Sequence, residues 1–128
     1  MHSVQRAEGI GGFFFRARDP QRLMAWYRDH LGIETMGADG AGGVWQQAAG
    51  PTVFAPFAHD TDYFGRPDQA CMLNFRVADL DAMLAQLRAA GTDVDDRIEL
   101  MEGIGRFGWA TDPEGNRFEL WQPAVPPS

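Results

Sequence analysis

The most constraining feature of this sequence is an internal repeat whose two copies lie sixty residues apart. One copy runs from Gly12 to a helical pattern closed at Gly32, and the other runs from Met72 to a pattern closed at Gly91. The identical positions are Phe15/Phe75, Arg16/Arg76, Asp19/Asp79, Ala25/Ala85 and Arg28/Arg88. Each copy predicts a strand, an aspartate that caps a helix of about 11 residues, and a glycine near the end of that helix. A repeat of this kind favours two similar modules over one irregular domain.

Strand candidates punctuated by glycine follow each predicted helix. In the first half they are Ile33–Met36, Val44–Gln47 and Thr52–Phe57. In the second half they are Val94–Leu100, Arg106–Ala110 and Arg117–Gln122. Between the last two lies Asp112–Asn116, in which proline sets φ and glycine allows a positive φ, so a tight turn is predicted.

The order strand–helix–strand–strand–strand therefore occurs twice. It divides the chain into modules at about residues 8–57 and 70–123, joined by a linker at 58–69. We treat residues 1–128 as a single domain, because a chain of this length is typical of one domain and can bury a sizeable core without a metal or a disulfide.

Charge and residue usage exclude several classes of function. The formal net charge is −7 and all 11 basic residues are arginines, so we expect no nucleic-acid partner. The lack of lysine excludes Schiff-base chemistry and a phosphate-binding P-loop. Cys71 is the only cysteine, which excludes a disulfide within the chain and a cysteine-based metal cluster. We find no apolar run of membrane-spanning length and no secretion-signal pattern, and expect a cytoplasmic protein with no membrane partner.

Three motifs carry a resemblance to a known superfamily: Asp19–Gly32, Phe75–Asp81 and, most specifically, Asp112–Trp121. Together with the double βαβββ order, they resemble the vicinal oxygen chelate superfamily of glyoxalases, extradiol dioxygenases and bleomycin-resistance proteins. The resemblance extends from about residue 10 to residue 123. It implies an α+β fold of two βαβββ modules in tandem. Each module would be a curved mixed sheet with one covering helix, and the two would form a cup-shaped cavity.

The resemblance also implies four metal-ligand positions, on the first and last strands of each module. In this sequence they fall on Gly12, Phe54, Met72 and Glu119. Glycine and phenylalanine cannot coordinate a metal, and the methionine thioether suits soft metals rather than those of this chemistry. We therefore expect no metal and no other cofactor. A divalent metal at a nonstandard site is the alternative.

Glu119 and Asn74 are the first candidates for a functional role. The period of two along a strand places Glu119 on the same face as Arg117 and Trp121. If this face lines the cavity, Glu119 is a buried carboxylate suited to general-base catalysis. Otherwise it faces solvent or pairs with an arginine. Asn74, between Leu73 and Phe75, either orients a ligand in the cavity or bonds the backbone.

The linker and two strand arginines supply further candidates. His59, with Asp60 or Asp62, could form a pair for acid–base catalysis or provide a nonstandard metal ligand. Alternatively, the linker is solvated and only anchored by its aromatic residues. Arg16 and Arg76 either clamp an anionic group or form ion pairs with acids at the sheet margin.

Aromatic residues are abundant, and several share strand faces with the implied ligand positions. The candidates for lining the cavity are Phe14, Phe54, Met72, Asn74, Trp109 and Trp121. An aromatic cup without a metal favours a flat or apolar ligand held by burial and stacking. Ordinary core packing explains the same residues equally well.

The leading functional hypothesis is a small-molecule-binding protein resembling the bleomycin-resistance branch, in which a ligand occupies an aromatic, acidic groove at a dimer interface. The net charge favours a neutral or cationic ligand. The alternative is a lyase, isomerase or dioxygenase with remodelled metal ligands, or a metal-free enzyme using Glu119 and His59. A scaffold with a vestigial cavity is a third reading. A homodimer is expected under each of the three.

Overall fold

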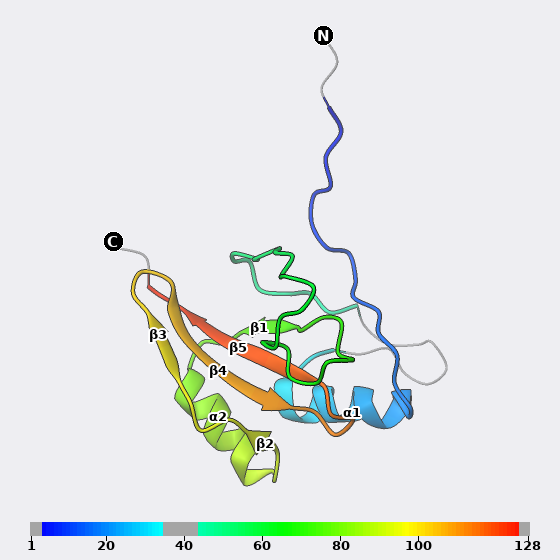
Figure 1. The fold of residues 1–128 in the computed structure, drawn as a ribbon, viewed down its shortest axis with the longest axis vertical. Coiled ribbons are helices and arrows are strands. Elements are labelled where there is room, and N and C mark those ends of the chain that lie inside the picture. Colours follow the sequence, from blue (N-terminus) through cyan, green and yellow to red (C-terminus); the bar gives the residue numbers. More distant parts are fainter. Residues whose placement is uncertain (1–3, 35–43, 126–128) are drawn as a thin grey trace.

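The computed structural model describes residues 4–34 and 44–125, which form two helices and one five-stranded sheet (Figure 1). In chain order the elements are α1 (Pro20–Leu31), β1 (Asn74–Arg76), α2 (Leu80–Ala89), β2 (Asp93–Val94), β3 (Glu99–Met101), β4 (Gly105–Thr111) and β5 (Arg117–Pro123). Neither helix is long and apolar enough to cross a membrane.

Both helices begin at the aspartates that the repeat predicts. Asp19 Oδ1 accepts a hydrogen bond from the backbone of Arg22 at 3.2 Å, and Pro20 occupies the first helical position. Asp79 Oδ1 caps α2 through the backbone of Ala82 at 3.0 Å. Gly32 ends α1 in the left-handed conformation, with φ at 70°, which a residue with a β-carbon adopts less readily. The local helix predictions are confirmed.

The sheet has the order β1-β5-β4-β2, and β3 also pairs with β4. β1 runs parallel to β5, whereas the other neighbouring strands are antiparallel, so the sheet is mixed. The second half of the chain therefore forms β1, α2 and four further strands, and the α+β fold class is confirmed. The predicted strand Val94–Leu100 is corrected to β2 and β3, because the chain bends between them, where Arg97 donates its backbone N–H to Asp95 Oδ1.

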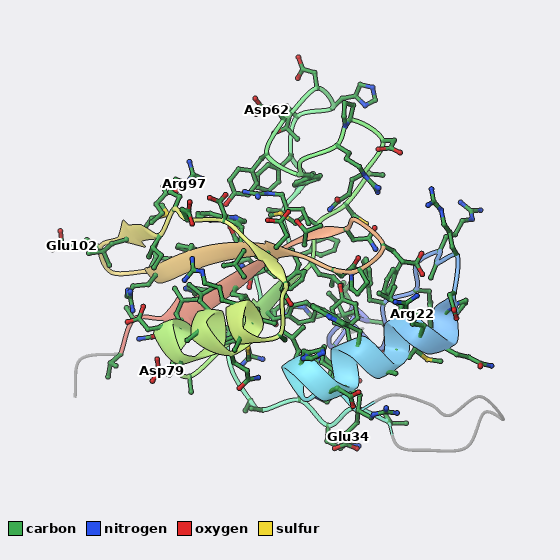
Figure 2. The ribbon with its side chains drawn as sticks, turned by 90° about the horizontal axis from the view of Figure 1, so that it is seen from below. Arg22, Glu34, Asp62, Asp79, Arg97 and Glu102 are labelled. Carbon is green, nitrogen blue, oxygen red and sulfur yellow. The ribbon has the colours of Figure 1, made fainter. Side chains whose placement is uncertain are left out.

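The core lies between α2 and one face of the sheet. Its buried members are Leu80, Leu84, Leu87, Ala110, Phe118 and Leu120. Gly108 lets α2 approach closely, because a β-carbon there would lie 3.2 Å from Leu84. Figure 2 shows both helices on one side of the sheet and the part of the chain that carries Asp62 on the other. Neither α1 nor α2 covers the side chains on that second face.

The strand predictions for the first half are wrong within the described residues. No strand forms in residues 4–19, 32–34 or 44–57, which include the described parts of Ile33–Met36, Val44–Gln47 and Thr52–Phe57, whereas residues 35 and 36 lie outside the described part. The segment before α1 runs away from the sheet as extended chain (Figure 1). A strand requires a partner for its backbone hydrogen bonds, and these segments meet none within the described chain. Phe14 and Phe54 are consequently 94% and 86% exposed.

Candidate functional site

The face of the sheet opposite α2 carries a row of side chains from three adjacent strands. Asn74 lies opposite Glu119 across β1 and β5, and Glu119 lies opposite Trp109 across β5 and β4. Two residues further along, Trp121 lies opposite Arg76 on one side and Phe107 on the other. We call this surface the inner face, and define it by Asn74, Arg76, Phe107, Trp109, Glu119 and Trp121. The pairing register alone brings these residues together.

Glu119 is the centre of the inner face, with only 8% of its surface exposed. Its Oε1 accepts a hydrogen bond from Asn74 Nδ2. Its Oε2 accepts one from the Tyr63 hydroxyl and another from Trp109 Nε1 at 3.1 Å. Among the described residues Glu119 forms no ion pair, so three neutral donors compensate for its burial.

Tyr63 reaches this cluster from the linker, and no pattern in the sequence predicts it as a partner of Glu119. Its ring stacks on Phe57 at 5.5 Å with planes 21° apart, and meets Trp109 edge-on at 6.2 Å. Its backbone oxygen accepts a hydrogen bond from Arg117 Nε at 3.2 Å. Burial, and then the hydrogen bond to Glu119, raise the pKa of Tyr63 to about 12. At neutral pH the phenol therefore stays protonated and can donate its hydrogen bond to the carboxylate of Glu119.

Trp109 is fully buried and is flanked by two guanidinium groups. Arg97 lies 4.6 Å from the ring centre and Arg117 lies 5.5 Å from it, both within cation–π range. Arg117 also pairs with Asp95 at 3.5 Å, and Arg97 pairs with Glu99 at 3.8 Å. The positive charge beside the inner face is therefore locally balanced.

Aromatic contact continues beyond Glu119. Phe107 and Trp121 stack with their centres 6.0 Å apart and their planes 4° apart. Trp121 Nε1 donates to the backbone oxygen of Ile104 at 3.0 Å, which fixes the orientation of the indole. Trp121 itself is buried, so the half-buried ring of Phe107 is the accessible aromatic surface at this end of the inner face.

The structure brings together only part of the predicted site. Asn74, Trp109, Glu119 and Trp121 share the inner face, whereas Phe14 and Phe54 lie on exposed extended segments. Met72 is half-buried just before β1, and His59 is exposed in a turn of the linker, as is Asp60 beside it. None of these five residues is a hydrogen-bond partner of Glu119 in the described part of the chain, since its partners there are Asn74, Tyr63 and Trp109.

The two strand arginines of the repeat also have separate surroundings. Arg76 donates from Nη2 to the backbone oxygen of Ala48 at 3.0 Å, rather than to an acid. Arg16 is exposed and lines a hollow of about 700 Å³ together with Phe13, Phe14 and Phe15. The repeat therefore relates their positions in the sequence but not their contacts.

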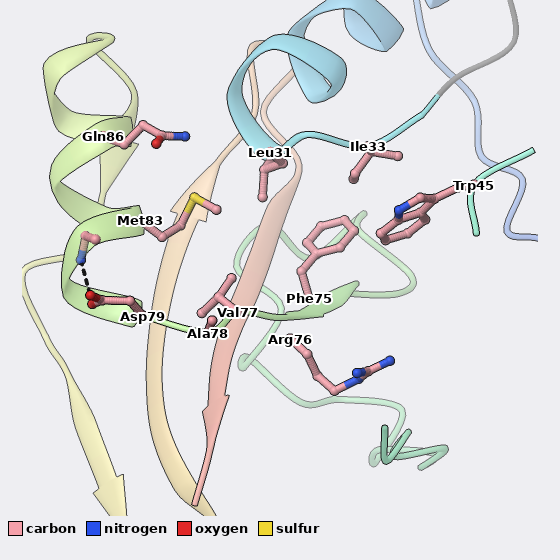
Figure 3. A pocket seen from close by; sticks show the side chains of 11 residues that line it. Leu31, Ile33, Trp45, Phe75, Arg76, Val77, Ala78, Asp79, Met83 and Gln86 are labelled. Atoms are coloured by element: carbon pink, nitrogen blue, oxygen red, sulfur yellow. Dashed lines mark hydrogen bonds between the residues drawn. The ribbon is translucent and has the colours of Figure 1, made fainter. Parts of the chain in front are cut away.

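Two hollows lie beside β1, and neither is lined by Glu119. The hollow of about 700 Å³ lies between residues 13–16 and the chain leading into β1. A second one, of about 320 Å³, lies on the helix side and includes Trp45, Phe75 and Met83, with Arg76 at its margin (Figure 3). The space directly over Glu119 is instead occupied by the ring of Tyr63.

The residues present do not fit the metal that the resemblance implies. Gly12 and Phe54 lie in exposed extended chain, and neither can donate to a metal. Both oxygens of Glu119 accept hydrogen bonds from protein donors. Within residues 4–34 and 44–125, no group of three or more His, Cys, Asp or Glu side chains is placed to hold an ion.

The tyrosines give a direct test of this geometry. Tyr27 and Tyr63 are the only two, and burial followed by a hydrogen bond to a carboxylate raises the pKa of both above the ordinary 10.0. We expect the folded protein to show almost no tyrosinate absorbance between pH 10 and 11, whereas the protein in denaturant titrates near 10. Because ionisation then favours the unfolded state, the free energy of unfolding should fall as the pH rises above 10.

Spectrophotometric titration checks this result, and Tyr63→Phe assigns whatever signal remains to Tyr27. A tyrosine of the folded protein that ionises with a midpoint near 10 would contradict the buried hydrogen bonds.

Comparison with known proteins defines the class of this domain. The structure of TnmS3, an antibiotic binding protein from Streptomyces sp. CB03234, matches with a TM-score of 0.62 and 23% identity, over 94% of this chain and 100% of that chain. A member of the glyoxalase/bleomycin resistance protein/dioxygenase superfamily from Sphaerobacter thermophilus DSM 20745 matches with a TM-score of 0.54 and 19% identity, over 83% and 90%. A lactoylglutathione lyase from Agrobacterium tumefaciens matches with a TM-score of 0.54 and 18% identity, over 92% and 96%. These likenesses show the fold of the vicinal oxygen chelate superfamily.

The profile of the glyoxalase-like domain family matches residues 12–121. This chain therefore belongs to the glyoxalase-like domain family, as the motifs at Asp19–Gly32 and Asp112–Trp121 predict. No significant match was found among curated proteins. The predicted membership in the superfamily is confirmed.

Proposed function

We propose that this protein binds a small apolar or aromatic molecule, neutral or cationic, on the inner face, without the metal of its metal-using relatives. The observation that carries the proposal is the composition of that face. A buried carboxylate, Glu119, lies opposite Trp109 and next to the stacked pair Phe107–Trp121, on the side of the sheet that neither α1 nor α2 covers. Family membership supports small-molecule binding as the general class.

The chemistry of the face defines the ligand. Flat aromatic surfaces bind flat aromatic or apolar groups through burial and stacking. A carboxylate accepts hydrogen bonds and repels anions, so a neutral donor or a cation is favoured. The nearby arginines do not reverse this preference, because Asp95 and Glu99 pair with them. An antibiotic binding protein among the structures of similar fold supports the same class of function.

Catalysis by Glu119 has less support than binding. A general base needs a free lone pair directed at the substrate proton, and here Asn74, Tyr63 and Trp109 donate to the carboxylate. An enzymatic role for His59 stays a prediction, since it lies exposed in the linker.

We also propose that the protein is a homodimer in the cytoplasm. The extended first-half segments expose Phe14, Val53 and Phe54, and a second copy would offer a backbone partner and an apolar cover for them. Sedimentation equilibrium should give a mass of twice the 14.2 kDa of one chain. The free, exposed thiol of Cys71 supports a reducing compartment.

The binding proposal is tested by titration calorimetry with three naphthalenes of similar shape: neutral 2-methoxynaphthalene, cationic 2-naphthylmethylamine and anionic 2-naphthoate. We expect saturable binding of the first two, at one site per chain, and about tenfold weaker binding of the anion. Phe107→Ala should weaken binding about tenfold by removing the stacking surface beside Trp121.

Phe13→Ala is the matched control, because Phe13 lines the 700 Å³ hollow and not the inner face. Loss of binding in Phe13→Ala, with Phe107→Ala unaffected, would move the site to that hollow and contradict the proposal.

A further inference from the structure

The ring of Tyr63 occupies the inner face in the way that a bound aromatic molecule would. It is stacked on Phe57, packed against the edge of Trp109 and only partly exposed. Its hydroxyl both donates to Glu119 Oε2 and accepts from Trp109 Nε1 at 3.2 Å. The phenol therefore has a partner both for its O–H group as donor and for its oxygen as acceptor.

The groups that form hydrogen bonds with the Tyr63 hydroxyl belong to the sheet. Glu119 and Trp109 are buried and face each other in the β4–β5 register, and Asn74 holds the second carboxylate oxygen from β1. This acceptor and this donor are set by the sheet, independently of the linker. They form a preorganised recognition site for one hydroxyl group.

Tyr63, by contrast, comes from the linker, whose other hydrogen bonds to the sheet are the two that Gln69 exchanges with the backbone of Arg117. Its neighbours Asp62 and Gly65 are exposed, and Asp60 is exposed as well. Apart from the ring contacts, Tyr63 is tied to the sheet by the hydrogen bond from Arg117 Nε to its backbone oxygen. Displacing the ring therefore breaks a limited set of contacts.

We propose that Tyr63 is an internal competitor that fills a subsite for a phenolic hydroxyl group, and that the ligand is a hydroxylated planar aromatic molecule. The ligand displaces the Tyr63 ring, donates its hydroxyl proton to Glu119 and accepts a hydrogen bond from Trp109. This inference rests on the proposed function and specifies the class of ligand.

The subsite distinguishes a phenol from its methyl ether. The ether cannot donate a proton, so its binding in place of Tyr63 would leave the buried carboxylate of Glu119 one donor short. Sites built to bond a hydroxyl discriminate strongly against analogues that lack it. Removing only the competing hydroxyl, in Tyr63→Phe, should favour the ligand over the internal ring.

Titration calorimetry at neutral pH with 2-naphthol and 2-methoxynaphthalene tests the proposal. We expect 2-naphthol to bind at least about tenfold more tightly than the ether. Tyr63→Phe should strengthen the binding of 2-naphthol by about tenfold, and Glu119→Gln should reduce the preference for the hydroxyl. Tyr27→Phe is the matched control, since it removes a tyrosine-to-carboxylate hydrogen bond elsewhere, to Asp112, and should change neither affinity.

A measurement on the unaltered protein keeps the test independent of how well Glu119→Gln folds. Hydrogen exchange in residues 57–65 should become faster when 2-naphthol is bound, because the linker loses its anchor, and should not change with 2-methoxynaphthalene. Slower exchange there with 2-naphthol would overturn the displacement of Tyr63.

The outcomes separate this inference from the proposed function. Equal affinity for the phenol and the ether would overturn hydroxyl recognition and leave aromatic binding in place. No binding of either compound to the unaltered protein or to Tyr63→Phe would overturn both. Binding of 2-naphthol that is no tighter in Tyr63→Phe than in the unaltered protein would overturn the competitor, since the internal hydroxyl would then not oppose the probe.

Discussion

Replacing Asp112 with asparagine should lower the free energy of unfolding by about 3 kcal/mol. Asp112 is only 3% exposed, and its carboxylate accepts four hydrogen bonds. The donors are the hydroxyl of Tyr27 at 2.7 Å, the side chain of Asn116 at 2.8 Å, and the backbones of Glu114 and Asn116. Asparagine lacks the negative charge. Its side-chain NH2 group would also point at one of these N–H or O–H groups, which cannot accept its hydrogen bond.

The expected loss of stability is large because Asp112 connects β4, β5 and α1. It holds the turn between β4 and β5, and through Tyr27 it fastens α1 to that turn. Glu114 adds to this attachment by accepting from the backbones of Arg18 at 2.5 Å and Asp19 at 2.9 Å, which holds the pKa of its carboxyl below its usual range. The first part of the most specific motif, the turn Asp112–Asn116, therefore has a structural role, whereas Glu119 and Trp121 of the same motif lie on the inner face.

Urea denaturation measures the effect, with Asp96→Asn as the matched control. The same loss of charge at exposed Asp96 should leave stability within about 0.5 kcal/mol of the original. Tyr27→Phe should account for about 1 kcal/mol of the Asp112 effect. An Asp112→Asn variant as stable as Asp96→Asn would contradict the cost that we expect from losing the charge and one acceptor oxygen.

Gly105→Ala should cost about 3 kcal/mol or more, the second large effect that we expect. Gly105 begins β4 with φ at 139°, where L side chains are strained. A β-carbon there would overlap the backbone oxygen of Gln122 and lie 2.7 Å from Trp121 Nε1. Since backbone cannot rotate away as a side chain can, the β4–β5 pairing must shift at that end.

Gly103→Ala separates steric overlap from backbone strain. Gly103 also has a positive φ, of 81°, but a β-carbon there would meet nothing within 4 Å. We expect it to cost only about 1 kcal/mol, measured by the same denaturation. Equal effects at the two glycines would mean that strain alone, and not the close approach of β5, limits position 105.

The helices and the site differ in how far they could be predicted from sequence. Asp19, Pro20 and Gly32 predict α1 correctly, because capping and backbone preference act within a few residues. The alternation around Glu119 places Trp121 on its face for the same reason. Tyr63 could not be found in this way, since it lies 56 residues from Glu119 in a linker without periodicity.

The strands predicted for the first half of the chain do not form, although their local pattern predicts them. Their sequence pattern is as strand-like as that of the second half, yet Phe14 and Phe54 lie in exposed extended chain. A strand is stabilised by the neighbour that pairs with it, and no pattern within one segment specifies whether that neighbour is present.

The sequence by itself determined the family, both helices with their caps, the turn at Asp112–Asn116 and the face on which Glu119 lies, because each depends on neighbouring residues. Only the tertiary structure decided which side chains meet Glu119. The β1–β5 register brings Asn74 from 45 residues away, and packing of the linker on Trp109 brings Tyr63. Contacts between remote segments depend on register and packing, which are properties of the assembled sheet.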